Sequence, residues 1–147
     1  MKVEKDPVSI NDLVQKTVRL AEVGTLKLKI RLDLSADLPI IQVDAPLMKQ
    51  VFLNLMKNAE EACHSCGELL IRTESVSPFV RISFADNGPG IPPESLNRIF
   101  EPFFTTKATG VGVGLSISQR IVQAHHGRID VNNLLPKGVQ FSILLPI

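Results

Sequence analysis

Tryptophan and tyrosine are absent from the 147 residues of this chain, and cysteine occurs only twice. The absence of both large aromatics argues against a stacking platform for single-stranded nucleic acid. Acidic and basic residues nearly cancel, and the net charge of +1 gives no field that would attract nucleic acid or an acidic membrane. No apolar run is long enough to cross a bilayer, and no signal-peptide pattern opens the chain. We therefore expect no nucleic-acid partner and no direct membrane contact.

The two cysteines form the motif Cys63-His-Ser-Cys66, which is compatible with a redox pair or with half of a zinc site. No second pair follows, and the strand expected before a redox pair of this kind is missing. We interpret the motif as the end of a long helix that carries two small, semi-apolar residues. So few cysteines fit a reducing, cytoplasmic compartment. Any membrane anchor of a parent protein would belong to segments outside this sequence.

Local signals predict an alternation of helices and strands. Ser9 and Asp44 are suited to cap helices, and Pro46 fits the first turn of the second one. The inward residues of that long helix are expected at helical spacing, at Leu47, Val51, Leu55, Ala59 and Ala62. The expected helices follow Ser9 for about three turns and then cover 45 to about 63, 94–99 and 114 to about 125. The expected strands are 28–34, 40–43, 69–73, 80–85, 129–132 and 139–145.

These elements mix without a strict strand-helix-strand rhythm, which predicts an α+β fold. The specific expectation is a two-layer α/β sandwich, in which helices pack on one face of a mixed sheet. A hydrophobic content of 44% over 147 residues is enough for one core. We expect a single domain over residues 1–147.

Five of the nine glycines lie in two clusters between residues 86 and 115. The second cluster, Gly110, Gly112 and Gly114, precedes an amphipathic helix, so its backbone N–H groups are suited to cradle phosphate. Lys107 stands just before it and could reach a terminal phosphate, although a solvated lysine is an equal alternative. The first cluster, Gly88 and Gly90, forms a second turn. Two separated glycine loops predict a nucleotide pocket.

Asn54 and Asn58 are four residues apart, so their amides stand on one face of the long helix. Asparagine is a poor helix former and usually has a reason to occupy a helix interior. An amide oxygen is a suitable ligand for Mg²⁺, which takes few protein ligands when phosphates supply the others. The alternative is a pair of exposed asparagines without a function.

Asp86 ends a strand in which Val80, Ile82 and Phe84 alternate to one side. A carboxylate at that place could accept a hydrogen bond from the exocyclic amine of a base. Asp-Asn-Gly is also a strong hairpin signal, but no strand returns directly. The chain continues through prolines into a short helical segment instead.

Four segments together resemble the ATP-binding domain of sensor histidine kinases. They are Asn-Leu-Met-Lys-Asn-Ala (54–59), Asp-Asn-Gly-Pro-Gly-Ile (86–91), Ile-Phe-Glu-Pro-Phe-Phe-Thr-Thr-Lys (99–107) and Gly-Val-Gly-Val-Gly-Leu (110–115). Their order and spacing are similar to those of the N box, the first glycine box, the F box and the second glycine box of that family. The resemblance covers nearly the whole chain, from about Asp6 to Pro146.

The resemblance implies the Bergerat-type sandwich that is shared with gyrase-like and Hsp90-like ATPases. It also implies ATP and Mg²⁺ as cofactors, and phosphoryl transfer to a histidine on a separate dimerisation domain that in turn serves a response regulator in a phosphorelay. Residues 1–8 would then be the remnant of a linker from that missing domain. Asn58 resembles the metal ligand, and Asn54, Asn58 and Lys107 are the expected catalytic residues. The implied nucleotide-binding set is Asn58, Asp86, Gly88, Gly90, Ile91, Phe100, Thr105, Thr106, Lys107, Gly110, Val111, Gly112, Val113, Gly114 and Leu115.

The sequence departs from the family pattern at several positions. Val111 replaces a threonine, and Glu61 stands where many relatives have a basic residue. The acceptor motif, a histidine followed by an acidic residue on a preceding helix, is absent. A gyrase-like ATPase would carry a glutamate as general base at the position of Asn54, and a neutral amide cannot take the proton. The residues therefore favour a kinase over a hydrolase, and a nucleotide-binding regulatory module remains an alternative.

Overall fold

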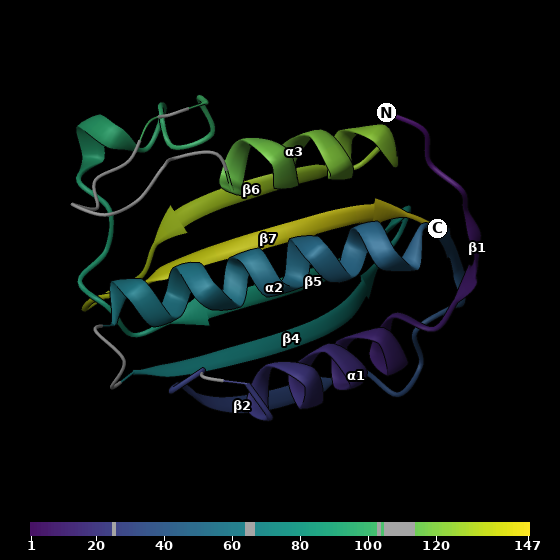
Figure 1. The fold of residues 1–147 in the computed structure, drawn as a ribbon, viewed down its shortest axis with the longest axis horizontal. Coiled ribbons are helices and arrows are strands. Elements are labelled where there is room, and N and C mark those ends of the chain that lie inside the picture. The colour runs from purple at the N-terminus through teal and green to yellow at the C-terminus, as the bar shows by residue number, and fades with distance from the viewer. Residues whose placement is uncertain (25, 64–66, 103, 105–113) are drawn as a thin grey trace.

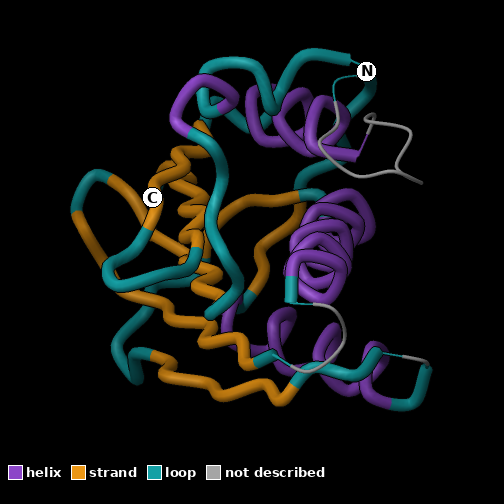
Figure 2. Tube along the Cα trace, turned by 90° about the vertical axis from the view of Figure 1, so that its left-hand side faces the viewer, coloured by secondary structure: helices purple, strands orange, loops and turns teal. Residues whose placement is uncertain are grey.

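A five-stranded sheet covered on one face by three helices forms the body of the protein (Figures 1 and 2). The computed structural model describes all residues except 25, 64–66, 103 and 105–113. The elements in chain order are β1 (Asp6–Val8), α1 (Ile10–Glu22), β2 (Lys29–Leu34), β3 (Ile41–Val43), α2 (Ala45–Ala62), β4 (Glu68–Val76), β5 (Phe79–Asp86), the 3-10 turn η1 (Pro93–Ser95), α3 (Gly114–Ala124), β6 (Arg128–Asn133) and β7 (Val139–Pro146).

The sheet is mixed, as the sequence predicted. Its strand order is β2-β4-β5-β7-β6, in which β2 and β4 are parallel and the other neighbours are antiparallel. Figure 2 shows the two layers edge-on, with the strands on one side and the helices on the other. The α+β two-layer prediction is therefore confirmed.

A second, two-stranded sheet pairs β1 with β3, with Asp6 opposite Val43. The sequence did not predict β1, because its partner lies far along the chain and three residues carry no periodicity. The assignment of residues 1–8 to a linker stays a prediction.

Both expected caps are present. The Ser9 side chain accepts a hydrogen bond from the Asp12 backbone N–H, and Asp44 accepts one from the Leu47 N–H at 3.1 Å. The second carboxylate oxygen of Asp44 accepts from the Glu4 N–H at 3.0 Å. One side chain thus caps α2 and fixes the segment that enters the domain.

The core lies between the sheet and the buried face of α2. Three of the five expected inward residues, Val51, Leu55 and Ala59, are buried, whereas Leu47 and Ala62 are only half-buried. Met48, Phe52 and Met56, which were not expected, widen the buried face. The Phe52 ring packs on Phe84 of β5, with 5.7 Å between ring centroids. The full set of buried residues in α2 is Met48, Val51, Phe52, Leu55, Met56 and Ala59.

The short helix expected over 94–99 is wrong in type and extent. Only Pro93–Ser95 form a helical turn, and it is a 3-10 turn. The amide of Ser95 donates to Pro92, that of Arg98 to Ser95, and that of Glu101 to Arg98. Each hydrogen bond joins residues three positions apart, so the segment forms successive tight turns instead of an α-helix.

Buried His125 connects the end of α3 to the start of α2. Its Nε2 accepts from the Asp44 N–H at 3.0 Å, and its Nδ1 lies 2.8 Å from the Ile121 carbonyl oxygen. We expect His125→Ala to lower the free energy of unfolding by about 2–4 kcal/mol, because two buried hydrogen bonds and the ring volume are lost. Urea unfolding measures the change. The adjacent control, His126→Asn, should stay within about 0.5 kcal/mol, because His126 is exposed and asparagine tolerates its φ of 62°.

Candidate functional site

Helix α2 carries both predicted amides, and that of Asn54 reaches the neighbouring helix α3. Asn54 and Asn58 are half-buried and lie one turn apart. The Nδ2 of Asn54 donates to the Ser118 hydroxyl at 3.2 Å and to the Gly114 carbonyl at 3.4 Å. Gly114 is the first residue of α3. The side chain of Asn54 therefore holds the start of α3 against α2.

Asp86 is a buried carboxylate at the end of β5, with 7% of its surface exposed. Its Oδ1 accepts hydrogen bonds from the backbone N–H groups of Gly88 at 2.9 Å and Val139 at 3.3 Å. Burial raises the pKa of Asp86 above its ordinary value, and these two hydrogen bonds act in the opposite direction. Both bonds go to Oδ1, which makes Oδ2 the candidate acceptor for a ligand.

The first glycine loop passes close to two other parts of the chain. A Cβ on Gly88 would lie 3.2 Å from the Ala62 carbonyl oxygen at the end of α2. Gly90 has φ +95°, and a Cβ there would lie 3.1 Å from Asn133 Oδ1. The loop thus needs glycine at Gly88 for close approach and at Gly90 for its backbone conformation.

The phenylalanine-rich segment packs onto the sheet. Phe100 meets Phe141 of β7 edge-on, with ring centroids 6.4 Å apart, and Ile99 is buried. The Arg98 guanidinium lies 4.7 Å from the centre of the Phe104 ring and forms an ion pair with Glu101 at 3.0 Å. These contacts anchor the described part of the F box in the fold.

Several predicted nucleotide-binding residues lie outside the described residues. These are Thr105, Thr106, Lys107, Gly110, Val111, Gly112 and Val113. Their roles in nucleotide binding stay predictions. Gly114 and Leu115 open α3, and Ile91 and Phe100 pack partly buried against the core. The site that the structure describes thus consists of α2, the end of β5 with its glycine loop, and the start of α3.

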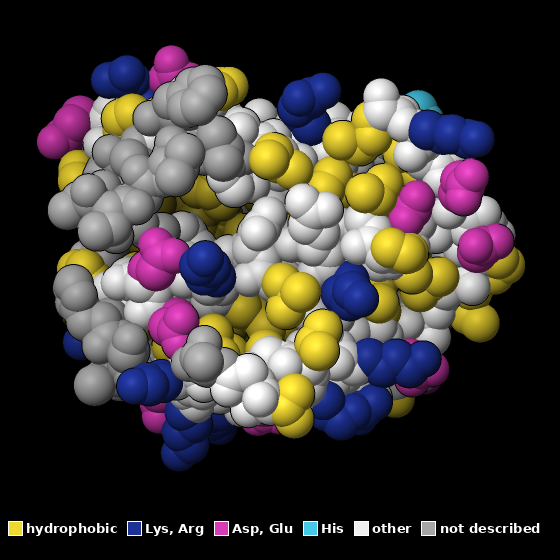
Figure 3. Space-filling view, viewed as in Figure 1, with side chains coloured by type: hydrophobic (Ala, Val, Ile, Leu, Met, Phe, Trp, Pro, Cys, Tyr) yellow, Lys and Arg dark blue, Asp and Glu magenta, His cyan; other side chains and the backbone are white. Residues whose placement is uncertain are grey.

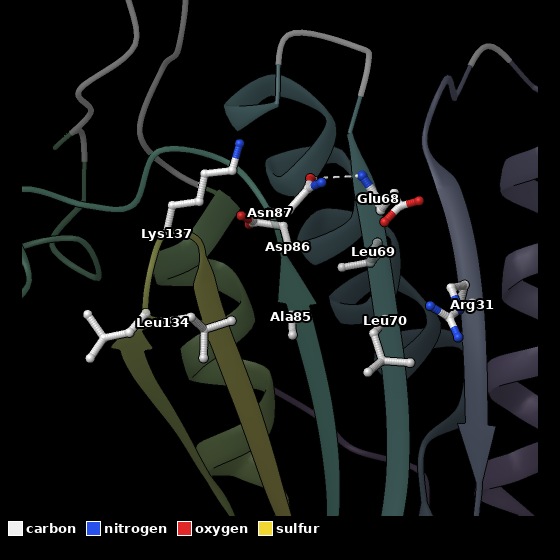
Figure 4. A pocket seen from close by; sticks show the side chains of 10 residues that line it. Arg31, Glu68, Leu69, Leu70, Ala85, Asp86, Asn87, Leu134 and Lys137 are labelled. Carbon is white, nitrogen blue, oxygen red and sulfur yellow. Dashed lines mark hydrogen bonds between the residues drawn. The ribbon is translucent and has the colours of Figure 1, made fainter.

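A space-filling view of the helix side shows a depression with apolar walls between the start of α3 and the C-terminal half of α2 (Figure 3). A different groove of about 310 Å³ lies at the end of β5, on the face of the sheet away from the helices (Figure 4). Its lining includes Arg31, Leu70, Lys137 and also Asp86. Asn54 and Asn58 do not line it, so the groove shares only Asp86 with the predicted nucleotide pocket.

Sequence reasoning missed Asn87 and Asn133, which brace the first glycine loop. Asn87 Oδ1 accepts from the Glu68 N–H at 2.9 Å and lies 3.5 Å from the Cys63 thiol. Burial, and then the charge of Asp86, raise the pKa of the Cys63 thiol, which keeps it protonated and a poor nucleophile. Their partners could not be inferred from local sequence, because Glu68 and Cys63 lie 19 and 24 positions from Asn87, and Ile91 lies 42 positions from Asn133. Cys66 lies outside the described residues.

Among the described residues, no group of three His, Cys, Asp or Glu side chains could hold a metal ion. A metal at this site would instead have to be bound by an amide oxygen together with ligand phosphates, as Mg²⁺ often is. None of the described helices has the length and apolar character of a bilayer span.

The known proteins that this chain resembles agree with the fold described above. The family model for the histidine kinase-, DNA gyrase B-, and HSP90-like ATPase matches residues 43–147. The signal transduction histidine-protein kinase AtoS of Escherichia coli (strain K12) is 41% identical over 143 residues, which make up 95% of this chain and 24% of AtoS. The solved catalytic domain of histidine kinase ThkA, in a nucleotide-free form, has a TM-score of 0.84 at 33% identity and covers 99% of this chain and 96% of its own.

A further solved structure, full-length ShkA in complex with AMPPNP, has a TM-score of 0.86 at 31% identity and covers 99% of this chain and 32% of its own. The chain belongs to the histidine kinase, gyrase B and Hsp90-like ATPase family, as a catalytic ATP-binding domain of the sensor histidine kinase type. It spans about a quarter of the length of AtoS.

Replacing Asp86 by Asn should stabilise the chain at neutral pH. A raised pKa in the folded state means that ionisation of Asp86 costs stability: the cost is absent below the ordinary value of 3.8 and complete above the folded pKa. Asparagine keeps an acceptor for the Gly88 and Val139 N–H groups without the charge. The unfolding midpoint of the Asp86→Asn variant should exceed that of the wild type at pH 7. The difference between the two midpoints should disappear as the pH falls toward 3.8.

Thermal unfolding followed by circular dichroism across this pH range measures the effect. The matched control is Asp86→Ala, which leaves both N–H groups without their acceptor and should be less stable than the wild type. An Asp86→Asn midpoint below that of the wild type at pH 7 would contradict the prediction.

Proposed function

We propose that this chain binds ATP with Mg²⁺ and supplies the γ-phosphoryl group to a histidine on a separate phosphoacceptor domain. The observation that carries the proposal is the hydrogen bonding of the Asn54 side-chain amide to α3. This amide occupies the place where a hydrolase of this family would need a carboxylate, and it is bonded to the start of α3.

The direction of those hydrogen bonds supports the choice between transfer and hydrolysis. The Asn54 NH₂ group donates to the Gly114 carbonyl, so a carboxylate in this orientation would place oxygen against oxygen. An amide cannot accept a proton from an attacking water. Asn54 thus positions α3 while leaving water near the phosphates without a base.

Asn58 is the residue that would hold Mg²⁺, through its amide oxygen. The fit rests on the chemistry of the donor set, since the described residues offer an amide on α2 and no carboxylate cluster. When bound, Mg²⁺ neutralises charge that develops on the transferred phosphoryl group. Asn58 itself fixes where that neutralisation occurs relative to the start of α3.

Asp86 would select the base. Oδ1 is held by two backbone N–H groups, so Oδ2 is left in a fixed direction. A carboxylate accepts from the amine of adenine but meets a carbonyl on guanine, which favours ATP over GTP.

The partner is inferred from the relatives. One solved structure contains histidine kinase ThkA in complex with the response regulator protein TrrA, and its kinase has a TM-score of 0.83 with this chain at 31% identity. We propose the same kinds of partner for this chain: the phosphoacceptor domain of its own kinase and, through that domain, a response regulator.

Incubation with γ-labelled ATP tests the proposal. We expect the chain alone to bind ATP, with a Kd in the micromolar-to-millimolar range, and to show no useful turnover. A phosphoacceptor domain added in trans should become labelled, because holding the acceptor in line with the terminal phosphate is the missing element. The label should be lost in acid, as phosphohistidine is.

Two other outcomes would overturn the kinase assignment. Steady release of phosphate from the isolated chain would favour an ATPase. Tight ATP binding without any label on the acceptor domain would favour a regulatory module.

Asn58→Ala should reduce phosphoryl transfer more than it weakens ATP binding. The metal acts mainly on charge that develops in the transition state, whereas the base contacts persist without it. We expect transfer to fall by about 100-fold or more, as for loss of a group that stabilises transition-state charge, and the Kd for ATP to rise by about tenfold or less. Single-turnover kinetics and calorimetry separate the two. Lys57→Ala, an exposed neighbour on the same helix, is the control, and equal losses in binding and transfer would make Asn58 a structural residue only.

A further inference from the structure

The side chain of Asn133 forms a reciprocal pair of hydrogen bonds with the backbone of Ile91. The Ile91 N–H donates to Asn133 Oδ1 at 2.8 Å, and Asn133 Nδ2 donates to the Ile91 carbonyl at 2.8 Å. The side-chain amide thus satisfies both backbone groups of Ile91, as the backbone of a neighbouring strand would. Ile91 is the residue that ends the first glycine loop. The two residues are 42 positions apart in the chain.

The sheet register places Asn133 in the same row of residues as Asp86. Asn133 of β6 lies opposite Val139 of β7, and Val139 lies opposite Asp86 of β5. Along this row, the Val139 N–H donates to Asp86 Oδ1, and the Asn133 side chain reaches Ile91. Residues of one row of the sheet therefore hydrogen-bond to Asp86, just before the loop of residues 87–91, and to Ile91 at the end of that loop.

The hairpin between β6 and β7 leaves this loop little freedom. The Leu134 N–H donates to the Gly138 carbonyl at 2.8 Å and closes the hairpin. A side chain on Gly138 would collide with the Asp86 carbonyl oxygen, so the two backbones are in direct contact there. Figure 4 shows Leu134 and Lys137 of this hairpin beside the end of β5 that carries Asp86.

We propose that Asn133 is a positioning residue for nucleotide binding, which holds the glycine loop in the shape that receives the base. The inference rests on the proposed function, since it assumes that the base binds beside Asp86. Gly90 supports it, because a Cβ at Gly90 would lie 3.1 Å from Asn133 Oδ1 and the loop backbone therefore rests directly on the amide. Asn133 itself is exposed, and exposed hydrogen bonds add little to global stability. Their effect is on where the loop lies.

The test compares Asn133→Ala and Asn133→Asp with the control Asn132→Ala. Asn132 has the same side chain, is equally exposed, and lies in the same strand, but its side chain has one weak hydrogen bond, to the Asn133 carbonyl at 3.5 Å. Asn133→Asp keeps an acceptor for the Ile91 N–H and loses the donor for the Ile91 carbonyl. We measure affinities for ATP, adenosine and inorganic triphosphate, and the unfolding midpoint without ligand.

Asn133→Ala should lower the affinities for ATP and for adenosine by the same factor, about tenfold for two lost hydrogen bonds. Its affinity for inorganic triphosphate, which lacks the base, should not change. Asn133→Asp should weaken both base-containing ligands as well, and Asn132→Ala should bind all three as the wild type does. Hydrogen exchange at the Ile91 amide should become faster in Asn133→Ala, with little change in the unfolding midpoint.

Three results would overturn the inference. Wild-type affinity for ATP in both Asn133 variants would show that the loop does not depend on the amide. Equal weakening of adenosine and triphosphate, or a large fall in the unfolding midpoint of both variants, would assign Asn133 a purely structural role. Failure of the wild-type chain to bind ATP at all would instead count against the proposed function, so the two hypotheses are tested separately.

Discussion

The burial of one face of α2 against the five-stranded sheet is the constraint on which the other features depend. Phe52 and its neighbours are fully buried against β5, so the helix can neither rotate nor slide without opening the core. This fixes the opposite side of α2, where Asn54 bonds to the first residue of α3 and the end of the helix meets Gly88. One packing interaction therefore sets where the first glycine loop lies relative to the start of α3.

Burial of the Asp86 carboxylate lowers the stability of the folded chain at neutral pH, and its proposed role in binding the base gives a reason for that cost. A carboxylate with 7% exposure is held by two backbone N–H groups, yet burial still raises its pKa. The ionised carboxylate loses its hydration on burial, and hydrogen bonds from two neutral backbone N–H groups do not fully offset that loss. The backbone donors direct one oxygen, and the proposed selection of the base would use the other, so the energetic cost and the proposed selectivity share one arrangement.

Much of the fold could be predicted from the sequence because its signals are local. The caps Ser9 and Asp44 and the alternation of strands such as β5 depend on neighbouring residues, and the boxes that carry Asn54, Asn58 and Asp86 are contiguous segments. Two differences arise where distant contacts decide: β1 exists only because β3 lies beside it, and Phe52 of α2 is buried where it meets Phe84 of β5. The difference near Ser95 is local, since successive three-residue turns replace the expected helix there.

The sequence by itself determined the class of fold, the amides and the carboxylate offered for a site, and the two glycines of the first loop, because side-chain chemistry and spacing along one element are enough for these. The tertiary structure alone decided which groups meet. Asn133 reaches Ile91 and Val139 reaches Asp86 because β6, β7 and β5 are neighbours in one register. Strand order and register result from packing of the whole sheet under its helices, and no short segment of sequence contains that information.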